Sequence, residues 1–197
     1  HLLDTLPPGE VVLYLWQNRH TVVIGRNQNP FREARVADLQ RDGGHLARRL
    51  SGGGAVYHDL GNLNFTFLAH KPDYDISRQT EVILEAVRAF GIPAERTGRN
   101  DITAQGRKFS GNAYFQRRER CYHHGTLLVS VDMDSLARYL NVPEQKLAQK
   151  GVASVRSRVV NLQALAPGMD IPALQDALRA AFERVYGLAP APLPPQR

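Results

Sequence analysis

The order of short strand-like runs along this chain is the feature that most constrains its fold. Val11–Trp16 and Thr21–Ile24 are β-rich and are separated by the polar segment Gln17–His20, which predicts a hairpin. Further runs bounded by glycine, asparagine or charged turns are His45–Arg49, Asn64–Leu68, Asp101–Ala104, Lys108–Phe115 and Gly125–Val131. Strands this short and closely spaced predict a sheet with substantial antiparallel pairing.

Two longer segments carry a helical pattern. Apolar residues recur at three- and four-residue spacing over Ser77–Phe90 and again from Pro172 to Val185, and each segment is followed by a glycine. Two shorter helices are expected, one capped by Asp134 and reaching Tyr139, the other from Pro143 to Lys150. The helices do not alternate regularly with the strands. We therefore predict the α+β class, with mixed, largely antiparallel β-sheets packed against helices.

The length of 197 residues fits one domain with a sizeable core. We expect that domain to cover residues 1–188, followed by the proline-rich segment 189–197 as an extended tail or the start of a linker. The chain opens with neither a methionine nor a secretory pattern, and we expect its N-terminus to be incomplete.

Composition excludes several classes of protein. No apolar run approaches the roughly 20 residues needed to span a bilayer, so no membrane segment is expected. The single cysteine, Cys121, cannot form an internal disulfide, which favours a cytoplasmic protein. The net charge of +6 suggests an anionic partner. The basic residues occur as short pairs without a long tract, so we expect phosphates or an acidic protein surface and no nucleic acid.

The stretch Arg48–Asn62, RRLSGGGAVYHDLGN, is the most unusual in the chain. Three successive glycines, Gly52 to Gly54, allow a backbone to pass close to a ligand and to present N–H groups to it. The flanking arginines and Ser51 can hydrogen-bond an anion. Neither the GxxxxGK[ST] nor the GxGxxG pattern is present, and on turn chemistry alone a bulge between strands is an equally good interpretation.

Taken whole, this stretch strongly resembles the signature of the lipoate–protein ligase A family, within the biotin and lipoate ligase superfamily. The segments LYLWQNRHTVVIGRNQNP, GRNDI, GRKFSGNAY, HHGTLL and KGVASVRSRVVNL resemble its other motifs, in the family's order. The resemblance implies a biotinyl/lipoyl-ligase-like catalytic domain. It also implies a reaction in two steps: lipoate and ATP form lipoyl-AMP and pyrophosphate, and an acceptor lysine then takes the lipoyl group.

The resemblance assigns roles to individual residues. Lys108 matches the family's central lysine, which would bridge the lipoyl carbonyl and the α-phosphate and stabilise charge as it develops. Asp101, oriented by Asn100, matches an acidic position that would hold Mg²⁺ arriving with ATP. An ordinary turn remains the alternative for these two residues.

Other matching positions are expected to bind the substrate or the adenylate: Arg49, Ser51, Gly53, Gly54, Ala55, Val56, His58, Asn62, Asn100, Ser110 and His124. Trp16 and Val23 resemble the wall of the lipoyl tunnel, although apolar strand residues are ordinarily core. For both histidines a purely structural role remains open, because hydrogen-bonded structural histidines are common.

The resemblance also implies partners: lipoyl domains of the E2 subunits of 2-oxo-acid dehydrogenases and the glycine-cleavage carrier protein. An accessory domain that assists adenylation has no counterpart in this sequence, and we expect a separate protein to supply it.

Two other functions remain open. One is an octanoyl or lipoyl acyltransferase that needs no ATP and depends on Lys108, or on Cys121 as a thioester carrier. Basic neighbours would favour a Cys121 thiolate, but its position does not resemble the cysteine motif of those transferases. The other is a non-catalytic lipoate-binding protein on the same scaffold.

Overall fold

The computed structural model describes residues 1–141, 158–188 and 191–192. The helix predicted from Pro143 to Lys150 and most of the proline-rich segment lie outside the described residues.

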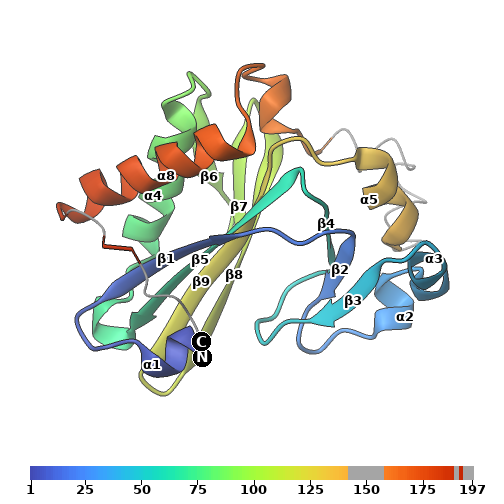
Figure 1. Cartoon of the computed structure of the whole chain (residues 1–197), viewed down its shortest axis with the longest axis horizontal. Coiled ribbons are helices and arrows are strands. Elements are labelled where there is room, and N and C mark those ends of the chain that lie inside the picture. Colours follow the sequence, from blue (N-terminus) through green and yellow to red (C-terminus); the bar gives the residue numbers. More distant parts are fainter. Residues whose placement is uncertain (142–157, 189–190, 193–197) are drawn as a thin grey trace.

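A large antiparallel sheet forms the centre of the molecule (Figure 1). Its strand order is β1 (Val11–Trp16), β5 (Asn62–His70), β9 (Arg120–Leu128), β8 (Arg107–Arg117), β7 (Asp101–Ala104) and β6 (Ala94–Thr97). Every neighbouring pair runs antiparallel. The predicted α+β class with largely antiparallel sheets is confirmed.

A second, smaller sheet lies beside the large one and contains the strand Thr21–Ile24, which was predicted to form a hairpin with Val11–Trp16. β2 (Thr21–Ile24) pairs in parallel with β3 (His45–Arg48) and antiparallel with β4 (Val56–His58), whereas β1 pairs with β5. The predicted hairpin between Val11–Trp16 and Thr21–Ile24 is therefore wrong. The physical reason is burial. All four residues of β2 are buried, so this strand needs partners on both edges and cover on both faces, which a hairpin with β1 does not provide.

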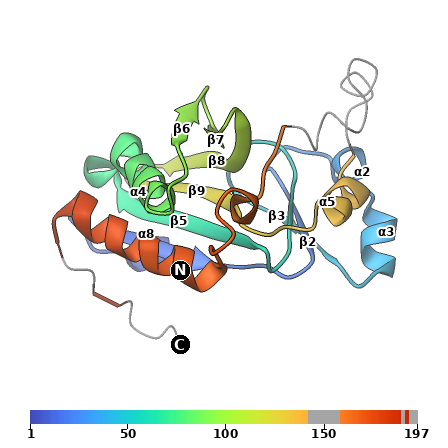
Figure 2. The same cartoon turned by 90° about the horizontal axis from the view of Figure 1, so that it is seen from above.

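Two long helices cover one face of the large sheet (Figure 2). α4 (Ile76–Arg88) begins after Asp75, whose carboxylate accepts the N–H of Arg78, and α8 (Ile171–Tyr186) begins after Asp170 in the same way. Gly187 ends α8 in the left-handed conformation, with φ +69°, as its sequence position predicts. Both predicted helices are confirmed, with ends that differ by a few residues.

The helices bury a large aromatic and aliphatic core against the sheet. Phe65, Phe67 and Phe109 from the strands are fully buried and pack with Ile83 of α4 and Leu174 of α8. Burying side chains of this size is the main source of stability for such a domain.

Shorter elements complete the described part of the chain: α1 (Leu2–Thr5), α2 (Pro30–Glu33), α3 (Val36–Arg41), η1 (Lys71–Asp73), α5 (Met133–Tyr139) and η2 (Leu162–Ala164). The helix from Asp134 to Tyr139 is confirmed, but its cap is wrong. Asp132 is the N-cap, and its carboxylate accepts the N–H of Asp134 in the first turn. Among the described helices, none has the length and apolar character needed to cross a membrane.

Candidate active site

The face of the large sheet that the long helices leave uncovered forms the floor of a cavity of about 1340 Å³. Side chains alternate along a strand, so Thr66 and Leu68 of β5 face this cavity whereas Phe65 and Phe67 face the helices. Typical small-molecule pockets measure about 300–1,000 Å³, so this cavity has room for an acyl chain and a nucleotide together.

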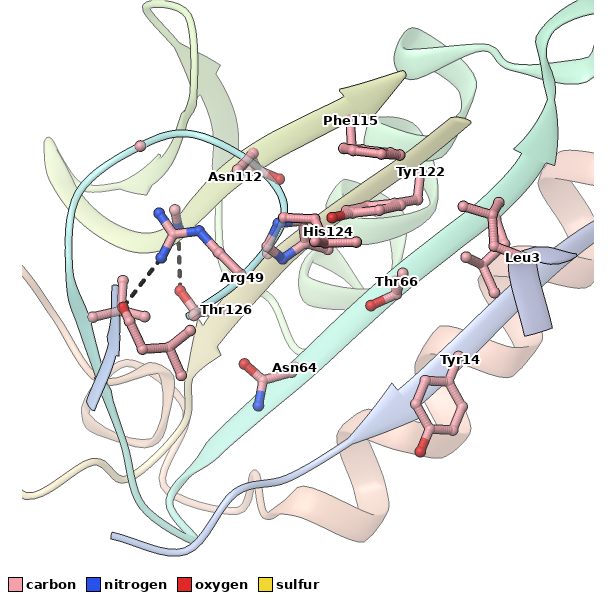
Figure 3. Close-up of a pocket in the computed structure, with 18 of the residues that line it drawn as sticks. Leu3, Tyr14, Arg49, Asn64, Thr66, Asn112, Phe115, Tyr122, His124 and Thr126 are labelled. Carbon is pink, nitrogen blue, oxygen red and sulfur yellow. Dashed lines mark hydrogen bonds between the residues drawn. The ribbon is translucent and has the colours of Figure 1, made fainter. Parts of the chain in front are cut away.

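The glycine-rich segment after β3 lines one side of the cavity. Arg49 holds its shape: the guanidinium donates to the carbonyl oxygens of Val23, Gly52 and Gly54, the last at 2.6 Å. Figure 3 shows the Arg49 side chain on the cavity wall. Arg48 donates in the same way to carbonyls of the segment after β2. Both arginines thus organise the backbone, although anion binding was their predicted role.

Two glycines are required for the close approach of these segments. A Cβ on Gly25 would lie 2.2 Å from the carbonyl oxygen of Gly53, and Gly53 itself has φ +97°. Gly54 differs, because it lines the cavity and a Cβ added there would meet no atom within 4 Å. Within the glycine triplet, Gly53 is therefore required by its backbone conformation, whereas Gly54 leaves open space that faces the cavity.

A β-bulge directs Lys108 toward that space. Ile102 pairs with Ser110 and the next residue of β7 pairs with Lys108, so Phe109 is an extra residue on β8. Past the bulge, the side chain of Lys108 lies on the same face as Gly111, whose added Cβ would be 3.0 Å from Nζ. The backbone of Lys108 is fixed from its other side by hydrogen bonds with Arg158 and Val160. Lys108, Gly53 and Gly54 thus line one cavity.

Lys108 Nζ lies 2.7 Å from Asp101 Oδ1, and both side chains are partly exposed. This pair bears on the predicted Mg²⁺ site. The described residues contain no group of three or more histidine, cysteine, aspartate or glutamate residues suited to a metal. One carboxylate fits a Mg²⁺ ion that also binds substrate phosphates, which is the usual form of such sites. Because Asp101 contacts the ammonium through Oδ1, Oδ2 is the oxygen that would bind a nucleotide-bound Mg²⁺.

Two histidines on the cavity wall are uncharged at neutral pH. Burial, reinforced by the positive charge of Arg49, lowers the pKa of His58 and of His124 to about 4 each. His124 Nε2 lies 2.6 Å from Ser51 Oγ, and Asn18 contacts His58 Nδ1 at 3.1 Å. With both imidazoles neutral, the positive charge on the cavity wall comes from Lys108 and the arginines that line it.

Most of the predicted site residues line the cavity: Trp16, Val23, Arg49, Gly53, Gly54, Ala55, Val56, His58, Asn100, Asp101, Lys108 and His124. Ser51, Asn62 and Ser110 do not line it. Each is buried behind the wall and contacts a lining residue: Ser51 contacts His124, Asn62 donates to Asn64, and Ser110 accepts from Asn112. Their predicted effect on a ligand is therefore indirect in this geometry.

Asn112 and its partner His123 belong to the cavity wall and its support, although no role was predicted for either residue. Asn112 lines the cavity, donates through its amide to the carbonyl of Asn100, and contacts His123 Nε2 at 2.8 Å. His123 is fully buried and its other ring nitrogen faces Gln79 of α4. Both residues lie within the GRKFSGNAY and HHGTLL segments, so the signal was in the motifs although no role was assigned to them.

Cys121 is fully buried on β9 and points away from the cavity, among the residues that face the helices. Burial raises the pKa of its thiol. Both observations argue against a thiolate nucleophile.

Comparisons with known proteins agree with this geometry. A family model described as the lipoyl protein ligase A/B catalytic domain matches residues 1–183. A structure of an archaeal lipoylation system from Thermoplasma acidophilum, described as a bi-partite lipoate protein ligase and its E2 lipoyl domain, contains a chain of 30% identity. It superposes with a TM-score of 0.85 over 95% of this chain and 76% of that chain.

Two further solved structures are similar and carry ligands. LipL1 of P. falciparum in complex with lipoate shares 34% identity at a TM-score of 0.77, over 90% of this chain and 48% of that one. A lipoate-protein ligase A bound with ATP shares 28% identity at a TM-score of 0.83, over 95% of this chain and 77% of that one. The chain belongs to the lipoyl protein ligase A/B catalytic-domain family.

Proposed function

We propose that residues 1–188 form the catalytic domain of an ATP-dependent lipoate–protein ligase. In the first step a lipoate carboxylate oxygen bonds to the α-phosphorus of ATP, and pyrophosphate leaves. In the second step the amine of an acceptor lysine bonds to the lipoyl carbonyl carbon, AMP leaves, and the nitrogen loses a proton. The observation that carries this proposal is that Lys108, the glycine-rich segment and the apolar wall of Trp16 and Val23 share one cavity.

The lining supports a ligand with an apolar chain joined to an anionic group. Trp16 and Val23 suit an aliphatic chain, whereas Lys108 and the backbone around Gly53 suit a carboxylate or a phosphate. Lys108 would stabilise charge in both steps, because negative charge develops on the lipoyl carbonyl and the α-phosphate in each transition state. Mg²⁺ bound with ATP would neutralise phosphate charge near Asp101.

The ligands of the neighbouring structures support the substrate assignment, since one is bound with ATP and another with lipoate. The pairing of the archaeal ligase with an E2 lipoyl domain supports a lipoyl domain of a 2-oxo-acid dehydrogenase as the acceptor. We extend this to the glycine-cleavage carrier protein, and we propose that a separate accessory domain assists adenylation.

The test is mass spectrometry of a purified apo-lipoyl domain after incubation with this chain, lipoate, ATP and Mg²⁺, with and without an added accessory domain. A mass gain equal to one lipoyl group, dependent on ATP, is the expected result. Transfer from an octanoyl carrier protein without ATP would favour the acyltransferase, and ligand binding without any transfer would favour the non-catalytic binding protein. Either result would contradict the proposal.

A further inference from the structure

The second half of β8 presents a free sheet edge beside the candidate active site. β7 pairs with β8 only from Arg107 to Gly111, whereas β9 pairs with it from Asn112 to Arg117. The N–H of Asn112 points away from β9, since it donates to Asn100 at 2.8 Å. Alternate residues of a strand point the same way, so the peptide groups of Tyr114 and Gln116 also face outward. In residues 1–141, 158–188 and 191–192, no strand pairs with them.

A smaller cavity of about 380 Å³ lies along this edge and is rich in aromatic and basic side chains. Tyr74 and Tyr114 provide apolar surface, and Arg96 and Arg99 provide positive charge. Both arginines are exposed, and within the described part of the chain neither makes a hydrogen bond or an ion pair with an acidic group. Unpaired cations beside an open strand edge complement an extended segment that carries acidic residues.

The edge separates the two cavities. Phe115 lines both cavities, and its ring stacks on Tyr122, which lines the large one. Figure 3 shows both rings on the same side of the sheet. Tyr114 faces the opposite side, where its ring packs on His123. A strand added to β8 would continue this alternation. Every second side chain would then point into the cavity of Lys108, and the others would point toward the two arginines.

We propose that this outer edge, Tyr114 to Gln116, is where the acceptor docks: an acidic, extended segment bearing the modifiable lysine adds to the large sheet as a further strand. Main-chain hydrogen bonds would fix the segment, and the alternation of the strand would direct the lysine amine toward the acyl group. Arg96 and Arg99 would select acidic residues on the same segment. This inference rests on the proposed function and assigns its acceptor a surface.

Hydrogen exchange of the backbone amides tests the docking without requiring turnover. On addition of an apo-lipoyl domain, the Tyr114 and Gln116 amides are expected to become protected, whereas those on the outer edge of β1 are not. Unchanged exchange at both positions overturns the proposal. Protection that depends on the concentration of this chain alone also overturns it, because the occupant would then be a second copy.

Substitutions test the same surface during transfer from preformed lipoyl-AMP. The double variant Arg96→Glu with Arg99→Glu is expected to raise the acceptor KM about 10-fold or more, because charge complementarity is lost. Gln116→Pro, made separately, is expected to have an effect of the same size, because the strand edge loses an N–H donor. Arg32→Glu, an exposed arginine of α2, is the matched control and should leave the KM unchanged. An unchanged KM in both edge variants overturns the proposal.

Fluorescence of Trp16, the only tryptophan, reports lipoyl-AMP binding separately, since this residue lines the cavity. Edge variants that bind lipoyl-AMP normally but transfer poorly support the docking surface. A wild-type chain that does not bind lipoyl-AMP would instead contradict the proposed function. The hydrogen-exchange experiment would still show whether the acceptor docks on the edge of β8.

Discussion

Replacing Lys108 with alanine separates a catalytic role from a structural one. Its side chain is 38% exposed and that of Asp101 is 45% exposed, so the ion pair between them contributes about 0–1 kcal/mol to stability. A preorganised donor at developing charge is worth far more, roughly 3–4 kcal/mol or a rate factor of about 10²–10³. We therefore expect Lys108→Ala to slow both steps at least ~100-fold while the free energy of unfolding changes by less than ~1 kcal/mol.

Three measurements follow the variant: pyrophosphate release with lipoate, ATP and Mg²⁺, transfer from lipoyl-AMP by mass spectrometry, and thermal unfolding by circular dichroism. Lys71→Ala is the matched control, because Lys71 is an exposed lysine on η1 that does not line the cavity. A Lys108→Ala variant that transfers at the wild-type rate would refute the assignment. A variant that unfolds would refute the argument from exposure.

The remaining predictions concern the glycines, the buried histidines and the thiol. Gly25→Ala should destabilise the fold by about 1–3 kcal/mol in urea unfolding, because its Cβ would overlap the Gly53 carbonyl. Gly54→Ala should keep wild-type stability but weaken lipoyl-AMP binding measured by fluorescence. A Gly54→Ala variant less stable than Gly25→Ala would contradict the contact geometry. Desolvation lowers the pKa of His123 to about 3 and the pKa of His58 and of His124 to about 4. The unfolded chain therefore binds protons that the folded chain does not, so stability is complete above about pH 6.5 and falls toward pH 4 by up to about 1.4 kcal/mol per group and pH unit. Urea midpoints that stay constant from pH 7 to pH 5 would contradict this, and His123→Asn should reduce the slope. Cys121→Ser should leave the transfer rate unchanged, and the native thiol should react with a thiol reagent only as the protein unfolds, since Cys121 is fully buried.

The sequence predicts the parts of the fold whose signals are local. α4 and α8 are long amphipathic helices with caps and a terminal glycine, so their existence follows from periodicity and turn chemistry. The pairing of strands is different. Gln17–His20 has the composition of a hairpin turn, but the partners of β1 and β2 are chosen by burial in two separate sheets. β4, β6, α2 and α3 are too short for a periodic signal.

The same distinction applies to the site. The motifs indicate that Lys108 and the glycine-rich segment act on one ligand, and residue chemistry explains why an ammonium and exposed N–H groups suit an anion. The motifs do not reveal that Arg49 donates to the carbonyl oxygens of Val23, Gly52 and Gly54, because these contacts depend on how the loop folds back against β2. The bulge at Phe109 is equally invisible, since Lys108 and Ser110 would share a face in a regular strand.

His123 of β9 is buried and connects α4 to the cavity wall through hydrogen bonds. The amide nitrogen of Asn112 donates to Asn100, so its side-chain oxygen remains to accept a hydrogen bond from the N–H of His123 Nε2. A neutral imidazole then needs a donor at Nδ1, and the amide of Gln79, whose NH₂ group otherwise has no partner, supplies one when rotated about its last bond. The chain of hydrogen bonds therefore runs from α4 through the sheet to Asn100, the residue before Asp101 at the start of β7. Gln79, Asn112 and His123 are buried, so removing one of these side chains leaves an unsatisfied polar group. Through Asn100, the buried side chains of the core thus help to hold the start of β7, and with it Asp101, in place beside Lys108.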